Sequence, residues 1–394
     1  MRKALVNRTI VLMLVIFLLG PFSAAAAKEL ELKIGVSVCM SGAAAATGLG
    51  LMRGLELAAE EINAAGGVKV QKDSYQIKLI MYDNKYDTKE GVAVANKLIY
   101  RDGVKYIVTM GAGLVVATNN LVVENKILQL AYCYGGKKTT NPGAPYTFKI
   151  LMEPINSYTI FLPWIAQKYN LKTIALTSND DETGLVQAED AEFVAKKIGL
   201  EITDKVLAPR GTADLTPMLT KLIAKKPQAI DFGSWGGSDG PLACKQAKEL
   251  GYQGVFIFIY TQSIPTWLKI APDRMDGVLF GGVFGSAPTP KATRVYERYK
   301  EKYKQEFDYL VWRNYDALLV LKKAIETAGT LDTTAVRDTM SKVSVDGIFG
   351  PTRVGGKSYY GIDAQYLYPI ALSKYDGKEK KFVELYRGSL AKDY

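Results

Sequence analysis

The hydrophobic positions of the chain follow two alternating patterns. Short runs of β-branched and other apolar residues, such as 32–38 and 106–110, predict buried strands. Between such runs, longer stretches place their apolar residues on one helical face; Leu51, Leu55 and Ile62 share a face within residues 51–65. Strands that alternate with helices in this way predict parallel sheets covered by helices on both faces.

This alternation runs through the chain in two series. The first predicts strands at 32–38, 76–83, 106–110 and 127–131 and helices at 51–65, 90–100 and 114–123. After a turn-rich break at 141–145, the second predicts strands at 173–177, 202–207, 229–233 and 255–259 and helices at 157–169, 184–198, 215–224 and 241–250. Residues 277–290 then return to the first lobe, followed by helices at 292–307, 315–328 and 334–343 and a β-rich segment at 347–386.

The two series predict an α/β fold of two lobes that the chain crosses between three times. We expect an N-terminal lobe of residues 28–151 and 283–365, and a C-terminal lobe of residues 152–282 and 366–394. Three crossings make a hinge, and a hinge between two α/β lobes makes a cleft that closes on a ligand.

Residues 1–27 have the order of a secretory signal peptide. Arg2, Lys3 and Arg8 precede an apolar run at 10–19, and small residues follow up to Ala27. A buried N-terminal helix is the alternative interpretation. We expect cleavage after Ala26 or Ala27 and export to the periplasm, without a lipid anchor because no cysteine lies at the junction.

Charge and composition narrow the functional classes. The mature chain keeps 47 basic and 40 acidic residues, a net charge of +7 spread along the chain, and its lysine clusters lack the interleaved aromatic residues of a nucleic-acid site. The absence of histidine excludes Ser-His-Asp and Cys-His nucleophilic sites and removes the commonest metal ligand. Three cysteines leave at least one unpaired within the chain; Cys39 and Cys133 each follow a predicted strand and could be neighbours.

Several segments resemble a known family. Ser41-Gly42, Ala46, Gly48 and the sequence EINAAGG at 61–67 are similar to the opening of periplasmic binding proteins of the leucine/isoleucine/valine-binding type. The resemblance implies a type I periplasmic binding protein with two Rossmann-like lobes. It also implies a ligand-binding component of an ABC importer that meets membrane permease subunits. Such a component is expected to be a monomer, to catalyse no reaction and to need no cofactor or metal.

The chain departs from this family at the positions that hold an amino acid. Matched by spacing, the serine and threonine with which the family binds the ligand carboxylate fall on residues without a hydroxyl. The acid that binds the amine falls just after the predicted strand 255–259, where this chain has Tyr260, Thr261 and Gln262. Backbone amides at the glycines could still bind an anion. The replaced positions are Gly113 or Leu114 for the serine, Gly135 or Gly136 for the threonine, and Thr47, Thr183 and Ser238 for three aromatic residues.

Aromatic residues have been gained where ligands of parallel sheets bind. Tyr132, Tyr134, Trp235 and Tyr260 lie at predicted strand ends, where rings could stack on a flat ligand or, alternatively, point into a core or solvent. We therefore predict an aromatic or other non-amino-acid carboxylate as the ligand. The candidate binding residues are Cys39, Thr47, Gly113, Leu114, Tyr132, Cys133, Tyr134, Gly135, Gly136, Thr183, Trp235, Ser238 and Tyr260.

Other functions remain as alternatives. A genuine branched-chain amino acid binder would require a different residue matching, and a ligand-sensing regulatory module could use the same fold. A secreted enzyme is disfavoured by the lack of histidine and of a nucleophile elbow. Gly48, Gly50 and Gly54 are spaced one residue too long for a dinucleotide-binding fingerprint, so they predict tight packing instead.

Overall fold

The computed structural model describes residues 30–260, 262–285 and 289–389. The predicted signal peptide and its cleavage site therefore lie outside the described residues.

The described strands form two sheets. The first sheet has nine strands in the order β12-β13-β14-β6-β5-β4-β1-β3-β2. They are β1 (Leu30–Val38), β2 (Val68–Val70), β3 (Asp73–Asp83), β4 (Tyr106–Met110), β5 (Leu128–Tyr132), β6 (Thr147–Lys149), β12 (Ser344–Asp346), β13 (Pro351–Gly355) and β14 (Gln365–Leu367).

The second sheet has seven strands in the described residues, in the order β16-β15-β11-β10-β9-β7-β8. They are β7 (Thr173–Asn179), β8 (Glu201–Ala208), β9 (Ala229–Asp231), β10 (Val255–Phe258), β11 (Leu279–Gly281), β15 (Pro369–Asp376) and β16 (Lys381–Ser389). The centre of each sheet is parallel, through β3-β1-β4-β5-β6 in the first and β8-β7-β9-β10-β11 in the second. Antiparallel strands lie only toward the edges.

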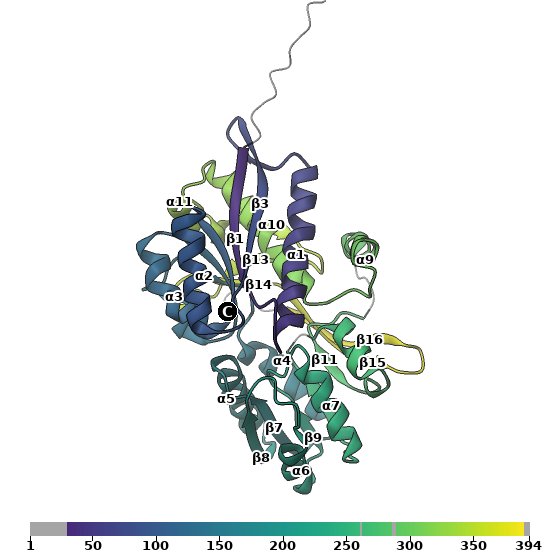
Figure 1. Ribbon diagram of the computed structural model, residues 1–394. Helices are drawn as coiled ribbons and strands as arrows, with labels where there is room; N and C mark the ends of the chain where they lie inside the picture. Colours follow the sequence, from purple (N-terminus) through teal and green to yellow (C-terminus); the bar gives the residue numbers. More distant parts are fainter. Residues whose placement is uncertain (1–29, 261, 286–288, 390–394) are drawn as a thin grey trace, which may run out of the picture.

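Helices cover both sheets (Figure 1). Those of the first lobe are α1 (Ala45–Ala64), α2 (Thr88–Asn96) with a π-helical continuation (Lys97–Arg101), α3 (Ala112–Glu124), α9 (Pro290–Tyr303), α10 (Val311–Ala328), α11 (Thr333–Arg337) and α12 (Lys357–Tyr360). Those of the second are α4 (Pro154–Lys168), α5 (Glu182–Lys197), α6 (Thr216–Ala224), α7 (Asp239–Glu249) and α8 (Ile264–Ile270). Short 3₁₀ turns lie at Gly136–Lys138, Pro272–Arg274 and Met340–Lys342.

The chain passes between the sheets three times, after β6, after β11 and between β14 and β15. The predicted fold class, two α/β lobes with parallel sheets joined by a three-crossover hinge, is therefore confirmed. The residue boundaries predicted for the two lobes stay a prediction. None of the described helices combines the length and apolar character needed to cross a membrane.

Several element bounds differ from those predicted, and helix α8 at Ile264–Ile270 was not predicted. Helix α1 begins at Ala45, before the predicted start at residue 51, because the small residues there carry no apolar periodicity although they pack closely. The helix predicted at 334–343 ends at Arg337 and is followed by a 3₁₀ turn. The Thr339 hydroxyl donates to the carbonyl oxygen of Ala335 at 2.8 Å, a local side-chain bond that competes with helix continuation.

Glycines set how closely α1 packs. Gly54 faces α10, and a β-carbon built there would lie far inside van der Waals contact of the Val311 carbonyl oxygen. Gly48 lies equally close to the carbonyl oxygen of Cys39, at the end of β1. The glycines that resemble a dinucleotide fingerprint therefore allow α1 to approach its neighbours, which agrees with the packing interpretation.

We expect Gly54→Ala to destabilise the protein by about 1–3 kcal/mol, although alanine ordinarily favours a helix by about 1 kcal/mol over glycine. Gly113→Ala in α3 is the matched control, because its β-carbon would meet only the Thr88 hydroxyl at 3.4 Å, an ordinary contact. Urea unfolding of both variants measures the difference. Equal effects of the two substitutions would contradict the close packing of α1 on α10.

Several carboxyl groups are buried. Burial raises the pKa of Asp231 and of Asp316 to about 7, and that of Asp308 to about 6. Asp231 accepts a hydrogen bond from the Tyr158 hydroxyl at 2.5 Å, and Asp316 accepts one from the Ile348 amide at 2.9 Å. These groups bind protons more tightly in the folded chain than in the unfolded chain, where an aspartate has a pKa of about 3.9.

We expect the free energy of unfolding to fall as the pH rises from 5 to 8. A raised folded-state pKa contributes stability at low pH that is lost as pH rises through the folded value, and the chain has no histidine to oppose this trend. Asp231→Asn should flatten the profile, because the amide cannot ionise. Urea unfolding at pH 5.5, 6.5 and 8 tests this, and a stability that increases with pH would contradict it.

Candidate functional site

The loops that follow the parallel strands of the two lobes face one another at the centre of the molecule (Figure 1). Polar contacts join the lobes there. The hydroxyls of Tyr86 and Thr183 lie 3.2 Å apart, and the Ser238 hydroxyl donates to the Ala43 carbonyl oxygen at 3.4 Å. Because strand ends of both sheets meet here, this junction is the expected ligand site of the fold.

Four tyrosines gather at the junction, and we call Tyr86, Tyr132, Tyr134 and Tyr260 the tyrosine cluster. The rings of Tyr134 and Tyr260 meet edge to face across the lobes, with centroids 5.7 Å apart at 86°. Burial raises the pKa of Tyr86 and of Tyr132 to about 12, and that of Tyr134 and Tyr260 well above its usual value. These phenols therefore stay neutral and can donate hydrogen bonds.

Arg210 brings a positive charge to the tyrosine cluster. It follows β8, and its guanidinium lies 5.1 Å from the ring centroid of Tyr86, a cation–π arrangement. Two of its nitrogens donate to one carboxylate oxygen of Asp181, at 2.7 and 2.9 Å. The contacts with Tyr86 and Asp181 fix the position of the guanidinium, and the side chain is mostly buried.

A second cation lies deeper, at the hinge. The side chain of Arg313 in α10 is buried, and its Nε donates to the Tyr368 hydroxyl at 3.0 Å. Its guanidinium also lies 4.5 Å from the ring of Trp312, and its charge lowers the pKa of Tyr132 and Tyr134 against the larger effect of burial. The tyrosine cluster is thus flanked by two arginines.

The loop after β5 is held by a buried ion pair. Lys149 and Glu153 are fully buried and their charged atoms lie 2.9 Å apart. The same Glu153 oxygen accepts from the Gly136 amide at 3.2 Å and from the Tyr360 hydroxyl at 2.6 Å. The Gly136 amide, which was predicted as a possible anion-binding group, therefore already donates its hydrogen bond to Glu153. Gly135 has a φ of 119°, which explains the glycine there.

The structure brings some predicted residues to the junction and turns others away. Tyr134, Tyr260, Thr183 and Ser238 make the contacts described above. Trp235 does not: its ring is fully buried in the second lobe, and its indole donates to the Thr177 hydroxyl at 3.2 Å. The alternative interpretation, a ring that points into a core, describes this tryptophan.

Predicted residues of the first lobe are mostly packed within it. Leu114 packs over Gly91 of α2, where a β-carbon would meet its side chain, while Gly113 lies beside it in the first turn of α3. Thr47 is buried in the first turn of α1. Cys39 and Cys133 are also buried, at the ends of β1 and β5.

Two charged residues of the junction, Arg210 and Glu153, were not predicted from the sequence. Arg210 follows an edge strand and meets Tyr86 of the other lobe only through folding. Glu153 lies at the first crossing between the lobes, between β6 and α4, where no periodicity of a helix or strand indicates the direction of a side chain. Tyr86 had one usable signal in the sequence, since it lies in the YDNKYD segment directly after a predicted strand.

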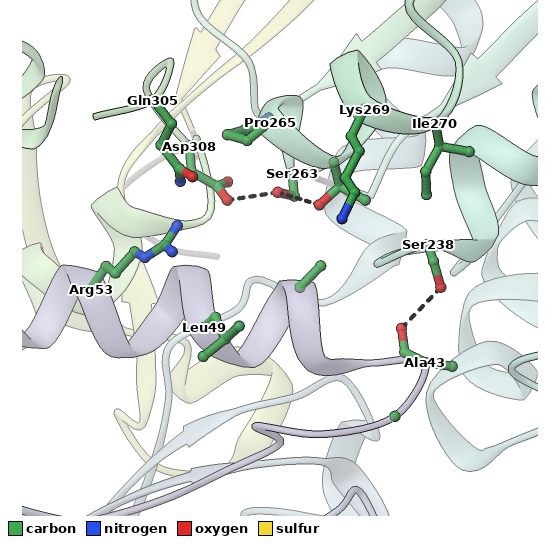
Figure 2. A pocket seen from close by; sticks show the side chains of 13 residues that line it. Ala43, Leu49, Arg53, Ser238, Ser263, Pro265, Lys269, Ile270, Gln305 and Asp308 are labelled. Atoms are coloured by element: carbon green, nitrogen blue, oxygen red, sulfur yellow. Dashed lines mark hydrogen bonds between the residues drawn. The ribbon is translucent and has the colours of Figure 1, made fainter. Parts of the chain in front are cut away.

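A separate cavity of about 420 Å³ lies beside the tyrosine cluster, between α1 and α8 (Figure 2). We call it the α1–α8 cavity. It is lined by Gly42, Ala43, Ala46, Leu49, Arg53, Ser238, Ser263, Pro265, Thr266, Lys269, Ile270, Gln305 and Asp308.

Taken together, two α/β lobes, a hinge of three crossings and a polar, aromatic junction define a protein that encloses a small ligand between its lobes. Residues 31–374 match the family model of periplasmic binding proteins, and the chain belongs to that family. The family resemblance inferred from the opening motif is thereby confirmed.

Individual relatives are distant but cover most of the chain. The chain is 25% identical over 336 residues to Leu/Ile/Val-binding protein homolog 3 of Brucella melitensis biotype 1, covering 85% of this chain and 89% of that one. A leucine-binding protein of Thermotoga maritima has a TM-score of 0.77 at 19% identity, covering 90% and 98% of the two chains. A solute-binding protein of Rhodopseudomonas palustris BisB5, in complex with 3,4-dihydroxybenzoic acid, has a TM-score of 0.79 at 20% identity, covering 92% and 98%.

All three cysteines are free and buried, so the bridge considered between Cys39 and Cys133 is not formed. Burial raises the pKa of Cys39 and of Cys133 to about 11, and that of Cys244 to about 12. A thiol with such a pKa is almost entirely protonated at pH 8, and the protonated form is not nucleophilic.

We expect the native protein to react only slowly at pH 8 with a thiol-specific disulfide reagent such as Ellman's reagent. Once the protein is unfolded in guanidinium chloride, all three cysteine thiols should react rapidly. Unfolding exposes the thiols and restores their ordinary pKa. Absorbance at 412 nm follows both reactions. Fewer than three thiols in the unfolded chain would mean that a disulfide forms.

Proposed function

We propose that the chain is the exported solute-binding component of an ABC importer, which captures a small aromatic carboxylate between its lobes and presents it to membrane permease subunits. It acts as a periplasmic monomer and performs no chemistry on the ligand. The ligand binds the closed conformation more tightly than the open one and shifts the population toward it.

One observation carries the ligand class: Arg210 of the second lobe lies over Tyr86 of the first, beside the edge-to-face pair of Tyr134 and Tyr260. A guanidinium presents donors in a planar fork that suits a carboxylate, and Asp181 uses only part of it. The tyrosine rings suit a flat apolar body, and their neutral hydroxyls suit its polar substituents.

The charges at the junction argue against an α-amino acid. An ammonium group needs a carboxylate partner, and two carboxylates of the junction already pair with cations, Asp181 with Arg210 and Glu153 with Lys149. Where the family places its amine-binding acid, the chain has Tyr260. A phenol hydroxyl can accept a hydrogen bond but does not neutralise a cation at neutral pH.

The comparisons support the importer role and leave room for two ligand classes. The fold that this chain shares with the Rhodopseudomonas protein accommodates 3,4-dihydroxybenzoic acid there. The names of the Brucella relative and the Thermotoga structure favour a second candidate, a branched-chain amino acid. The same experiment separates the two.

We expect benzoate or 3,4-dihydroxybenzoate to raise the melting temperature of the mature chain, residues 28–394, and leucine to leave it unchanged. A ligand at 100 times its dissociation constant adds about 2.7 kcal/mol of stability, which a thermal-shift assay detects. Stabilisation by leucine, and by neither aromatic acid, would overturn the proposed ligand class.

Two variants locate the site. Arg210→Lys keeps a charge beside Asp181 but loses the planar fork, and Tyr260→Ala removes one ring; each should weaken aromatic acid binding about tenfold or more by calorimetry. Arg274→Gln, an exposed arginine of the same lobe, is the control and should bind normally. Unchanged affinity in Arg210→Lys and Tyr260→Ala would place the ligand elsewhere.

A further inference from the structure

We propose that the α1–α8 cavity is a second binding site, which takes a small dianion such as a short dicarboxylate and bridges the two lobes. This site is distinct from the tyrosine cluster, and the proposal does not depend on which ligand that cluster binds.

Each lobe contributes one cation to the cavity. Arg53 extends from α1 and Lys269 from α8, and both point into the space between the helices (Figure 2). Within the part of the chain that the structure describes, neither forms an ion pair with a carboxylate. Two unpaired cations on opposite walls of one cavity create a positive potential that attracts an anion with two charged ends.

Arg53 is held in position for such a role. Its Nη1 donates to the Tyr299 hydroxyl at 3.0 Å, and its guanidinium lies 4.9 Å from the ring centroid of Tyr303. These contacts fix the plane of the guanidinium while most of its five N–H donors remain for other partners. A side chain fixed before binding loses less conformational entropy when a ligand arrives.

The cavity has one acidic lining residue, Asp308, and its carboxylate is engaged. It accepts from the Ser263 hydroxyl at 2.6 Å and from the Leu310 amide at 3.0 Å. Burial raises its pKa to about 6, so the carboxyl is mostly ionised at pH 7 and its charge interacts with that of Arg53. Asp308 therefore offsets at most one of the two positive charges, and the lining keeps a net positive charge.

The shape and lining suit a small organic dianion. A volume of about 420 Å³ lies within the range of small-molecule sites, about 300–1,000 Å³, and far exceeds the volume of a single ion. Leu49 and Ile270 provide apolar walls for a short methylene chain, and the Ser238 and Thr266 hydroxyls provide further hydrogen bonds.

The cavity is separate from the tyrosine cluster. No member of that cluster lines it, and the chain closes between them at Ala43, whose carbonyl oxygen accepts from the Ser238 hydroxyl at 3.4 Å. Gly237 also packs on Ala43, so that a β-carbon there would lie 2.5 Å from the same oxygen. A dianion that contacts Arg53 and Lys269 together would favour the closed lobes.

The test measures binding of succinate and glutarate to the mature protein by calorimetry and thermal shift, against sodium chloride at matched ionic strength. We expect both acids to bind the wild-type protein and to stabilise it beyond the effect of the salt. Arg53→Gln and Lys269→Gln should each weaken binding about tenfold, because each removes a charge-assisted hydrogen bond. Arg53→Lys should recover only part of the loss.

Two further variants make the outcome decisive. Lys225→Gln removes an exposed lysine of the second lobe outside the cavity and should bind as the wild type does. Tyr260→Ala should also keep its succinate affinity, because Tyr260 does not line the cavity. No stabilisation beyond that of sodium chloride, equal binding by the Arg53 and Lys269 variants, or loss of binding in Tyr260→Ala would each overturn the proposal. The last result would place the dicarboxylate in the tyrosine cluster.

Discussion

The buried ion pair between Lys149 and Glu153 is the interaction on which the ligand-facing loops depend. It joins the end of β6 to the first crossing between the lobes, and the same carboxylate holds the Gly136 amide and the Tyr360 hydroxyl. Removing one partner of a buried pair costs about 3–5 kcal/mol, because the other charge is left without compensation. The hinge and the loop that carries Tyr134 are therefore stabilised by one set of contacts.

The backbone and the side chains of the junction depend on different interactions. The loops keep their positions because glycines, the ion pair and the close packing of α1 determine the backbone. The side chains at the ends of the strands are then free to change. In this chain they supply tyrosine rings and the guanidinium of Arg210, which is a different set of chemical groups on the same scaffold.

The sequence predicted the fold well, because apolar periodicity and strand order depend on local patterns. It identified β1, β4 and the central helices, and it placed the candidate site at strand ends. It missed the start of α1, where alanines and glycines carry no periodicity, and it missed Arg210 and Glu153. Arg210 meets Tyr86 across the lobes and Glu153 meets the Gly136 amide at the hinge, and both contacts depend on how the sheets are placed in space. For Trp235, the position after β9 was predicted, but the sequence does not show that its ring points into the core of the second lobe.

The central claim is that the junction of the lobes binds an aromatic carboxylate through Arg210 and the tyrosine cluster. A crystal structure of the mature protein with 3,4-dihydroxybenzoate tests it most directly. We expect the carboxylate within hydrogen-bond distance of the Arg210 guanidinium and the ring enclosed by Tyr86, Tyr134 and Tyr260. A ligand bound with its carboxylate away from Arg210, or outside the tyrosine cluster, would contradict the account.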